Sequence, residues 1–291
     1  MNEMITINAN AKINLTLDIL GKRDDGYHEV SMIMQSINLF DTLTLKKLNT
    51  KDIILHGDVR GVENVQDNLI YKAVKLFLDT YKIQNGVEIE LIKRIPIAAG
   101  LAGGSTDAAA TLRGLNELFE MNLSVMSLCK LGEKLGSDVP FCIMGGTMLA
   151  TGRGEILAQV ADMPKVNLVL VKPKIDVSTA WVYKNYHKVE NEVVHPDNKK
   201  MRKALILKDI NQICACLKNV LEYVTIKQYP QINDIKEKLC SYGAKTAMMS
   251  GSGPTVFAIV KNKTLAEEIA AKIKNDFDAE VFTVETASKN F

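Results

Sequence analysis

The chain has 291 residues, of which 47% are hydrophobic and 24% are charged, and this composition is typical of a soluble globular protein with one large domain or two moderate ones. Its 36 lysines and arginines nearly balance its 34 acidic residues, so the formal net charge is +2. This balance argues against nucleic-acid and membrane partners that need a basic field, and any anion must bind at a local site.

The first predicted element is a half-buried strand near the N-terminus. Apolar residues at 13, 15, 17 and 19 alternate with polar ones, and this period of two predicts that Lys12 and Asn14 lie on the face away from the core. The alternation starts near residue 5, so we expect a bend or bulge between Asn8 and Ala11. Residues 21–26 are rich in turn formers and predict a loop.

Strands and a helix follow before a segment of small residues. Strands are predicted at residues 41–46 and 87–92, with a helix over 67–81 between them. Residues 99–104 are all glycine and alanine apart from one leucine. We expect a loop there, directly after the second of these strands.

The next predicted elements are two helices, a turn and a strand. The Ser-Thr-Asp sequence at 105–107 is suited to cap a helix whose apolar stripe runs to residue 119. A second helix is predicted from Ser124 to Gly136, because glycine commonly ends a helix. Pro140 disfavours helix at the residue before it, so we expect a turn at 137–140 and a strand at 141–150.

The second half of the chain predicts a different pattern. An apolar strand at 167–172 is followed by helical patterns to about residue 242. The remaining elements are predicted as strands at 246–249 and 255–260, a helix at 265–277 and a strand at 280–284. The order β-α-β-β-α-β is that of ferredoxin-like domains. Polar residues 188–203 predict a surface loop, and we place the domain boundary near residue 160.

The cysteines and the apolar segments bear on where the protein resides. The five cysteines form no C-x-x-C pair, so we expect neither a disulfide framework nor a structural zinc site, and most should be buried free thiols. The N-terminus does not resemble a signal peptide, and no apolar run approaches the roughly 20 residues that span a bilayer. We therefore expect a cytoplasmic protein; its oligomeric state is not predicted.

The small residues before 105–107 favour phosphate binding. They would let a phosphate approach the backbone, while the free N–H groups of the helix start point at it. The hydroxyls of Ser105 and Thr106 could add hydrogen bonds or a ligand to a phosphate-bound magnesium ion, and Asp107 should face outward or toward a cation. The alternative is a turn that only packs helix on strand. No Walker A lysine and no G-x-G-x-x-G spacing is present.

Three segments in chain order resemble the motifs of the GHMP kinases (galactokinase, homoserine kinase, mevalonate kinase, phosphomevalonate kinase). They are Ala-Lys-Ile-Asn-Leu at 11–15, the glycine-rich segment at 96–109, and Ser-Gly-Ser-Gly-Pro-Thr-Val-Phe at 250–257. The departures are Ala99 and Ala102, where glycine is frequent in that family. The third motif is expected to form a turn that brings backbone N–H groups toward the cleft, or a simple hairpin, or both.

The resemblance covers nearly the whole chain and implies the fold class. It implies an α+β, two-domain GHMP kinase-like fold. Residues 1–160 would form the N-terminal ribosomal-protein-S5-like α/β domain, which binds ATP and catalyses. Residues 161–291 would form the C-terminal ferredoxin-like α/β domain.

Within this family, two further strings narrow the resemblance. Asp-Gly-Tyr-His at 25–28 and Gly-Ser-Asp-Val-Pro-Phe at 136–141 are similar to members whose substrate is a small alcohol with a cytidine diphosphate group. The resemblance implies Lys12 and Asp138 as catalytic residues, ATP and Mg²⁺ as cofactors, and no metal ligand that can be named from the protein. The implied ATP-binding residues are Pro96, Ile97, Ala98, Ala99, Gly100, Leu101, Ala102, Gly103, Gly104, Ser105 and Thr106. The implied substrate-binding residues are Asn14, Tyr27, His28 and Tyr183.

The chemistry agrees with these assignments but leaves alternatives. A carboxylate can take the proton of an acceptor hydroxyl, or mainly position it, and a nearby ammonium can stabilise transferred phosphoryl charge. Aromatic rings can stack on a base, although Trp181 competes with Tyr183 for that role. Other readings are a kinase of the homoserine or mevalonate type, a ligand-binding sensor without catalysis, and an anion-binding scaffold for RNA, which the lack of a basic stripe disfavours.

Overall fold

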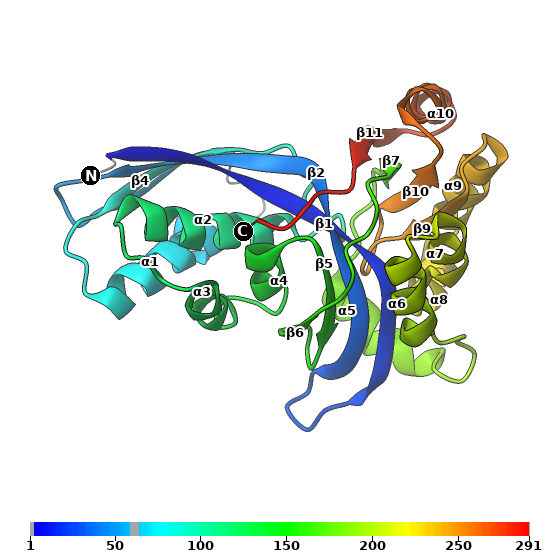
Figure 1. Ribbon diagram of the computed structural model, residues 1–291, viewed down its shortest axis with the longest axis horizontal. Coiled ribbons are helices and arrows are strands. Elements are labelled where there is room, and N and C mark those ends of the chain that lie inside the picture. The colour runs from blue at the N-terminus through cyan, green and yellow to red at the C-terminus, as the bar shows by residue number, and fades with distance from the viewer. Residues whose placement is uncertain (1–2, 59–63, 291) are drawn as a thin grey trace.

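Two β-sheets with helices packed against them organise the chain (Figure 1). The computed structural model describes residues 3–58 and 64–290. The strands are β1 (Met4–Lys22), β2 (His28–Lys47), β3 (Ile53–Gly57), β4 (Val87–Ile92), β5 (Thr147–Thr151), β6 (Ile156–Gln159), β7 (Asn167–Pro173), β8 (Lys218–Asn219), β9 (Thr246–Met249), β10 (Val256–Val260) and β11 (Ala279–Glu285).

The helices gather in two groups. Those of the first half are a 3-10 helix η1 (Val65–Asp67), α1 (Leu69–Tyr81), α2 (Gly103–Leu118), α3 (Val125–Gly132) and α4 (Val139–Met144). Those of the second half are α5 (Thr179–Asn185), a 3-10 helix η2 (Tyr186–Lys188), α6 (Asn198–Leu207), α7 (Ile210–Cys216), α8 (Glu222–Gln228), α9 (Gln231–Ser241) and α10 (Lys263–Asp276).

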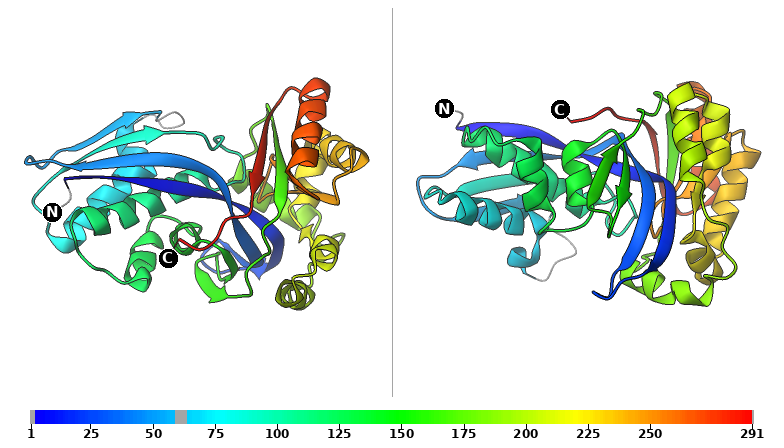
Figure 2. Two further views of the ribbon diagram at one scale, coloured as in Figure 1. Left: turned by 45° about the horizontal axis from the view of Figure 1, so that its top comes forward. Right: turned by 60° about the horizontal axis from the view of Figure 1, so that its bottom comes forward.

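The first sheet carries the first half of the chain. Its strand path is β3-β4-β2-β1-β8, and β5 pairs with β2 and β6. Helices α1 to α4 lie on one side of it (Figure 2). The predicted strand over 87–92 and the helix over 67–81 are confirmed to within two residues, whereas the predicted strand over 41–46 is the end of a strand of 20 residues.

The second sheet has the order β11-β7-β10-β9, and all its pairs are antiparallel. The chain order of these strands is β7, β9, β10, β11, with α9 before β9 and α10 before β11, as the ferredoxin-like pattern predicts. Strand β7 is buried on both faces. Leu168 and Leu170 join one core cluster, while Val169 and Val171 join the other.

Irregularities in the pairing of β1 with β2 allow side chains of this one strand to join both core clusters. The register with β2 shifts between Asn10 and Lys12 and again between Asn14 and Thr16, so the predicted bulge is confirmed. Residues 5, 9, 17 and 19 belong to the first core, and residues 11, 13 and 15 belong to the second. The expectation that Lys12 and Asn14 lie on an open face is wrong: their exposed fractions are 5% and 0%, because other segments cover that face.

The strand predicted at 141–150 is wrong in its first half. Residues 139–144 form helix α4, and the strand begins only at Thr147. Pro140 is the second helical residue, where its missing N–H has no intrahelical partner to lose. A short apolar run is compatible with a buried helix as well as with a strand, and here tertiary packing decides.

Two predicted helix ends also differ. Helix α2 begins at Gly103 with Ala102 as its N-cap, so Ser105 and Thr106 lie inside its first turn and do not cap it. The helix predicted from Ser124 begins one residue later, and Ser124 is its N-cap, with its Oγ accepting from the N–H of Ser127 at 3.2 Å. The helix ends at Gly132 and not at Gly136, and the three residues that follow form turns.

The surface loop predicted over 188–203 is confirmed for residues 189–197, which form no helix or strand and are mostly exposed, and is wrong from residue 198 on. Residues 198–203 are the start of α6, and Met201 is fully buried. His195 Nδ1 lies 2.7 Å from Asp18 Oδ1. Asn198 accepts from the hydroxyl of Thr16 at 2.6 Å, so these contacts hold the segment against β1.

The predicted division after residue 160 falls between β6 and β7. Later residues nevertheless join the first half, because β8 pairs with β1 and residues 286 and 289 form bridges with residues 37 and 145. The division into residues 1–160 and 161–291 therefore stays a prediction.

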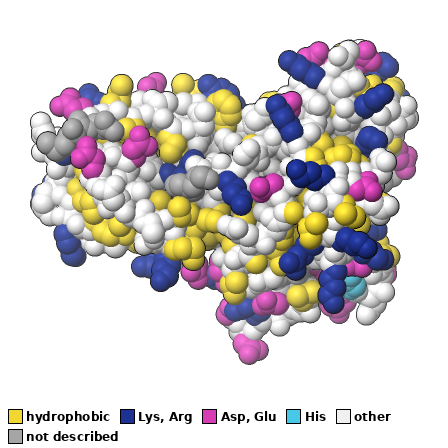
Figure 3. All heavy atoms as spheres, viewed as in Figure 1, with side chains coloured by type: hydrophobic (Ala, Val, Ile, Leu, Met, Phe, Trp, Pro, Cys, Tyr) yellow, Lys and Arg dark blue, Asp and Glu magenta, His cyan; other side chains and the backbone are white. Residues whose placement is uncertain are grey.

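Surface charge, thiols and helix lengths complete the comparison. Acidic and basic side chains are interspersed over the face in Figure 3. All five cysteines are free, but only Cys142 is buried, so the expectation that most are buried is wrong. Across residues 3–58 and 64–290, no helix has the length and apolar character needed to cross a bilayer.

Candidate active site

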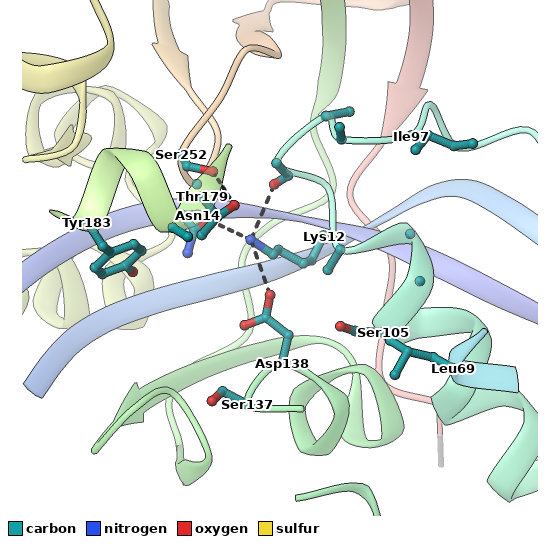
Figure 4. A pocket seen from close by; sticks show the side chains of 18 of the residues that line it. Lys12, Asn14, Leu69, Ile97, Ser105, Ser137, Asp138, Thr179, Tyr183 and Ser252 are labelled. Carbon is teal, nitrogen blue, oxygen red and sulfur yellow. Dashed lines mark hydrogen bonds and ion pairs between the residues drawn. The ribbon is translucent and has the colours of Figure 1, made fainter. Parts of the chain in front are cut away.

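A cavity of about 1110 Å³ lies between the two halves of the chain (Figure 4). The first half contributes β1, the start of β2, the loop before α2, the first turn of α2 and the residues before α4. The second half contributes α5 and the turn between β9 and β10. Motifs far apart in sequence therefore meet in one place.

The loop from β4 to α2 forms the wall of small residues. Nine of the eleven residues predicted to bind ATP line the cavity; the two that do not are Leu101 and Thr106. Leu101 is buried in the second core, and Thr106 donates its hydroxyl to the carbonyl of Asn10 at 2.6 Å. The hydroxyl of Ser105 remains at the cavity wall (Figure 4).

Glycine is required at position 100 by the third motif. Gly100 has φ +74°, and a Cβ there would collide with the carbonyl oxygen of Ser250. The hydroxyl of Ser250 also donates to the Gly100 carbonyl at 2.9 Å. The turn at 250–253 thus lies against the loop, and Gly251 and Ser252 line the cavity, as expected for a motif that both joins two strands and reaches the site.

Lys12 and Asp138 come together at the cavity wall. Lys12 Nζ lies 3.9 Å from Asp138 Oδ2, donates to Asn14 Oδ1 at 2.8 Å and contacts the Gly100 carbonyl at 3.3 Å. Asp138 is the N-cap residue of α4, yet its side chain makes no capping bond. Its carboxylate, with 31% of the side chain exposed, faces the cavity (Figure 4), where it can accept a proton or a hydrogen bond from a bound hydroxyl.

Both ends of the Asn14 amide contact neighbouring side chains. Its oxygen accepts from Lys12, and its amide nitrogen lies 3.2 Å from the sulfur of Met32. Asn14 lines the cavity, and this arrangement orients the ammonium of Lys12. Its predicted contact with the substrate stays a prediction.

An aromatic group lines the cavity, and Tyr183, one of its members, lies on the side of Lys12 away from Ser105 (Figure 4). The rings of His28 and Tyr183 are 5.4 Å apart, and the guanidinium of Arg153 lies 5.0 Å above the ring of Tyr27. All four residues line the cavity. Burial and the nearby charge of Lys22 lower the pKa of His28, so its ring is neutral near pH 7.

The helical spacing of α5 places Tyr183 at the cavity and Trp181 away from it. Residues 179, 180, 183, 184 and 187 line the cavity, a spacing that places them on one side of α5 and η2. Trp181 lies outside this set and packs against the first core. Burial raises the pKa of Tyr183, so its hydroxyl is protonated and can donate.

Asp107 faces a cation, which answers the charge problem that the sequence posed. Lys93 Nζ lies 2.8 Å from Asp107 Oδ2 and 2.5 Å from Asp41 Oδ2. All three side chains are buried or nearly so. Burial, only partly offset by Lys93, raises the pKa of Asp107 to about 7.

Sequence reasoning missed several lining residues. Arg153 is on the turn between β5 and β6, and only the Gly-Arg-Gly sequence around it signals an exposed position there. The hydroxyls of Thr179 and Ser252 lie within hydrogen-bond distance, 2.8 Å, at the cavity wall. Ser252 belongs to the third motif, which was expected near the cleft, whereas Thr179 stands in no motif, so no sequence feature identified Thr179 or its contact with Ser252.

Family models match both halves of the chain. The model described as GHMP kinases N terminal domain matches residues 68–146, and the model described as GHMP kinases C terminal matches residues 201–279. The first match includes the small-residue loop and Asp138, and the second includes the third motif.

Curated relatives match almost the full length. A 4-diphosphocytidyl-2-C-methyl-D-erythritol kinase of Acetivibrio thermocellus is 49% identical over 284 residues, which cover 98% of this chain and 99% of the relative. A protein of the same name from Lachnoclostridium phytofermentans is 49% identical over 265 residues, 91% of each chain.

Solved structures share the fold. The crystal structure of a 4-(cytidine 5'-diphospho)-2C-methyl-D-erythritol kinase superposes with a TM-score of 0.83 at 28% identity, covering 98% of this chain and 100% of that one. A homoserine kinase from Cytophaga hutchinsonii has a TM-score of 0.76 at 19% identity, covering 99% and 96%. The second likeness shows the fold alone.

Proposed function

The chain belongs to the GHMP kinase family, and on this premise we propose that it transfers the γ-phosphoryl group of ATP to the 2-hydroxyl of 4-diphosphocytidyl-2-C-methyl-D-erythritol. The products are the 2-phosphate and ADP, in the non-mevalonate route to isoprenoid precursors. One observation carries the proposal: Lys12 and Asp138 meet between a phosphate-binding loop and an aromatic group.

The arrangement supports direct transfer between two bound substrates. With ATP phosphates on the 96–105 loop, the acceptor hydroxyl lies beside Asp138, whose carboxylate takes or orients its proton. The acceptor oxygen forms the new bond to the γ-phosphorus as the bond to the β-phosphate oxygen breaks, and ADP leaves. Lys12 Nζ contacts the Gly100 carbonyl in that loop, and its ammonium would stabilise the charge of the phosphoryl oxygens.

The site fits magnesium held mainly by ATP. Among residues 3–58 and 64–290, no three His, Cys, Asp or Glu side chains gather as a metal site. Mg²⁺ commonly uses one or two protein oxygens together with phosphates and water, and Ser105 offers such an oxygen at the loop. Thr106 does not offer one, because its side chain is buried outside the cavity lining and its hydroxyl donates to the carbonyl of Asn10. Bound there, the ion would neutralise phosphate charge.

The aromatic group supports a substrate with a base. Tyr27, His28 and Tyr183 can stack on or hydrogen-bond to a pyrimidine, and Arg153 adds a positive charge beside them. Homoserine and mevalonate carry no base, so neither would stack on these aromatic rings. We place the reaction in the cytoplasm, where five free thiols stay reduced.

The test is ADP release with a panel of acceptors. We expect turnover with the cytidylyl compound, little with mevalonate, homoserine or galactose, and a loss of at least about 100-fold in kcat for Asp138→Asn, because one general base contributes about 10² to 10⁴. Folding of the variant is checked by its melting temperature.

Each other outcome has a distinct meaning. Turnover with a different acceptor keeps the kinase and rejects the cytidylyl substrate. Nucleotide binding without turnover of any acceptor favours a ligand-binding sensor. Full activity of Asp138→Asn rejects the role of Asp138.

A further inference from the structure

Residues 286–290 leave the second sheet and lie against the first half of the chain. Thr286 forms a bridge with Ile37, and Lys289 forms one with Gly145. The backbone N–H of Ala287 donates to the carbonyl of Ser36 at 2.8 Å. Figure 1 shows this segment running from β11 to the end of α4.

Asn290 satisfies the last carbonyl groups of α4. Its side-chain Nδ2 donates to the carbonyls of Cys142 at 2.9 Å and Ile143 at 3.2 Å, and its backbone N–H donates to the carbonyl of Met144 at 3.0 Å. The carbonyl of Phe141 accepts from the N–H of Gly145 at 2.7 Å. A helix leaves its last four carbonyls without intrahelical partners, and here one residue from a distant segment serves three of the four.

The helix that Asn290 caps is the one that presents Asp138. Helix α4 has six residues, and Asp138 directly precedes it, with its carbonyl accepting from the N–H of Cys142 at 3.0 Å. A helix this short gains little from its own hydrogen bonds. Its position therefore depends on packing along its sides and on the bonds at its far end.

The fit around Asn290 is close. A Cβ on Gly145 would lie 3.0 Å from the side-chain Cγ of Asn290, and one on Gly146 would lie 2.7 Å from the Cγ of Lys289. Both glycines have positive φ angles. The turn after α4 is thus shaped to receive this segment.

We propose that Asn290 is a positioning residue for phosphoryl transfer, which holds Asp138 at the acceptor hydroxyl by capping the opposite end of α4. The inference rests on the proposed catalytic role of Asp138. Asn290 touches neither substrate, and it acts through the helix.

The first test compares Asn290→Ala with a matched variant, Asn38→Ala. Asn38 Oδ1 accepts from the N–H of Glu285 at 2.7 Å, so its loss loosens the same part of the chain without touching α4. We expect Asn290→Ala to lower kcat about tenfold, equivalent to about 1.4 kcal/mol, with dissociation constants of ATP and acceptor unchanged by calorimetry. Asn38→Ala should retain the kcat of the unmodified protein.

The second test is a double-mutant cycle with Asp138→Asn. If Asn290 acts through Asp138, Asn290→Ala has no further effect on the residual kcat of Asp138→Asn. An equal loss in both backgrounds, or a kcat unchanged by Asn290→Ala, overturns the inference. Should the alanine variant not fold, Asn290→Gln, which keeps the amide donor, takes its place with an intermediate kcat expected.

The two proposals fail in different ways. If Asp138→Asn alone leaves kcat intact, the proposed role of Asp138 fails and the inference fails with it. If Asp138→Asn abolishes activity while Asn290→Ala and Asn290→Gln both match the unmodified protein, the inference alone is rejected.

Discussion

Among single side chains, Asp107 combines deep burial with an incomplete set of partners. Its Oδ2 pairs with Lys93, while its Oδ1 has no hydrogen-bond partner among the described residues. Lys93 is shared with Asp41, so one ammonium serves two carboxylates. An ionised Asp107 is therefore poorly compensated in the folded protein.

We expect this residue to make stability fall as pH rises. The pKa of Asp107 is about 7 in the folded protein and 3.8 without these surroundings, so the folded state holds the proton more tightly. The stabilising contribution of protonated Asp107 is fully present below about pH 4 and is lost as the pH rises through about 7. The slope from this one residue is at most about 1.4 kcal/mol per pH unit.

Urea unfolding at pH 5 and pH 8 measures this effect. The decrease in unfolding free energy between the two pH values should be smaller for Asp107→Asn than for the unmodified protein, because asparagine does not titrate. Equal decreases in the two proteins would show that Asp107 is ionised throughout.

Short strings with a known order predicted a shared site for Lys12, Asp138 and the 96–106 loop. The structure brings Lys12, Asp138 and most of the loop to one cavity, and their roles in catalysis and ATP binding stay predictions. The partners of Asp107 could not be predicted, because Asp41 lies 66 positions earlier in the numbering and nothing in the sequence near it marks an ion pair. Spatial pairs between distant segments leave no local pattern.

Among the elements, the loop before α2 and the turn at 250–253 depend on each other. We expect Gly100→Ala to raise the KM for ATP about tenfold and to lower stability by about 1 to 2 kcal/mol, because alanine at positive φ is disfavoured and its methyl would meet Ser250. Steady-state kinetics and thermal unfolding measure the two effects.

Ala102→Gly is the matched control for this loop. Ala102 already has φ +59°, so glycine there removes a methyl from a strained position and should leave the KM for ATP near that of the unmodified protein. A similar rise of KM in both variants would point to general loop mobility and not to the contact with residue 250.

Element prediction failed where tertiary packing overrides local preference. Helix α4 and the start of α6 were expected as strand and loop, and both are held in place by residues from distant parts of the chain. The period-two pattern of β1 was readable, but the full burial of its polar face was not. That burial comes from segments about 90 and 240 residues later.

Across the whole molecule, Asn198 links the second half of the chain to the first. It accepts from Thr16 at 2.6 Å and donates to Ser31 at 2.8 Å. We expect Asn198→Ala to lower the unfolding free energy by about 2 kcal/mol, at about 1 kcal/mol for each lost bond. Urea denaturation checks this value.

Asn211→Ala provides the comparison. Asn211 bonds to Lys245 at 3.0 Å on the surface, and both residues belong to the second half, so its loss should change stability by less than about 0.5 kcal/mol. Equal effects of the two substitutions would mean that the hydrogen bonds of Asn198 between the halves add no more to the unfolding free energy than a surface bond within one half.

The two-domain architecture was predictable because each half has its own sequence pattern. The first half contains the small-residue loop between a strand and a helix, and the second half has the ferredoxin-like order of elements. The crossings were not predictable. Strand β8 and residues 286–290 return to the first half by short pairings, and two or three residues give too little pattern to recognise.

The shared strand β1 has a consequence for folding. Its residues at 11, 13 and 15 belong to a core cluster that takes members from 33–39 and 95–101 and also from 163–170, 201–213 and 248–259, so the burial of its middle is completed only when most of the chain has been synthesised. Contacts of such long sequence separation slow the search for the native state. A ribosome-bound chain of about 160 residues would therefore expose an apolar strand segment, and we expect chaperones to be recruited at this stage of synthesis.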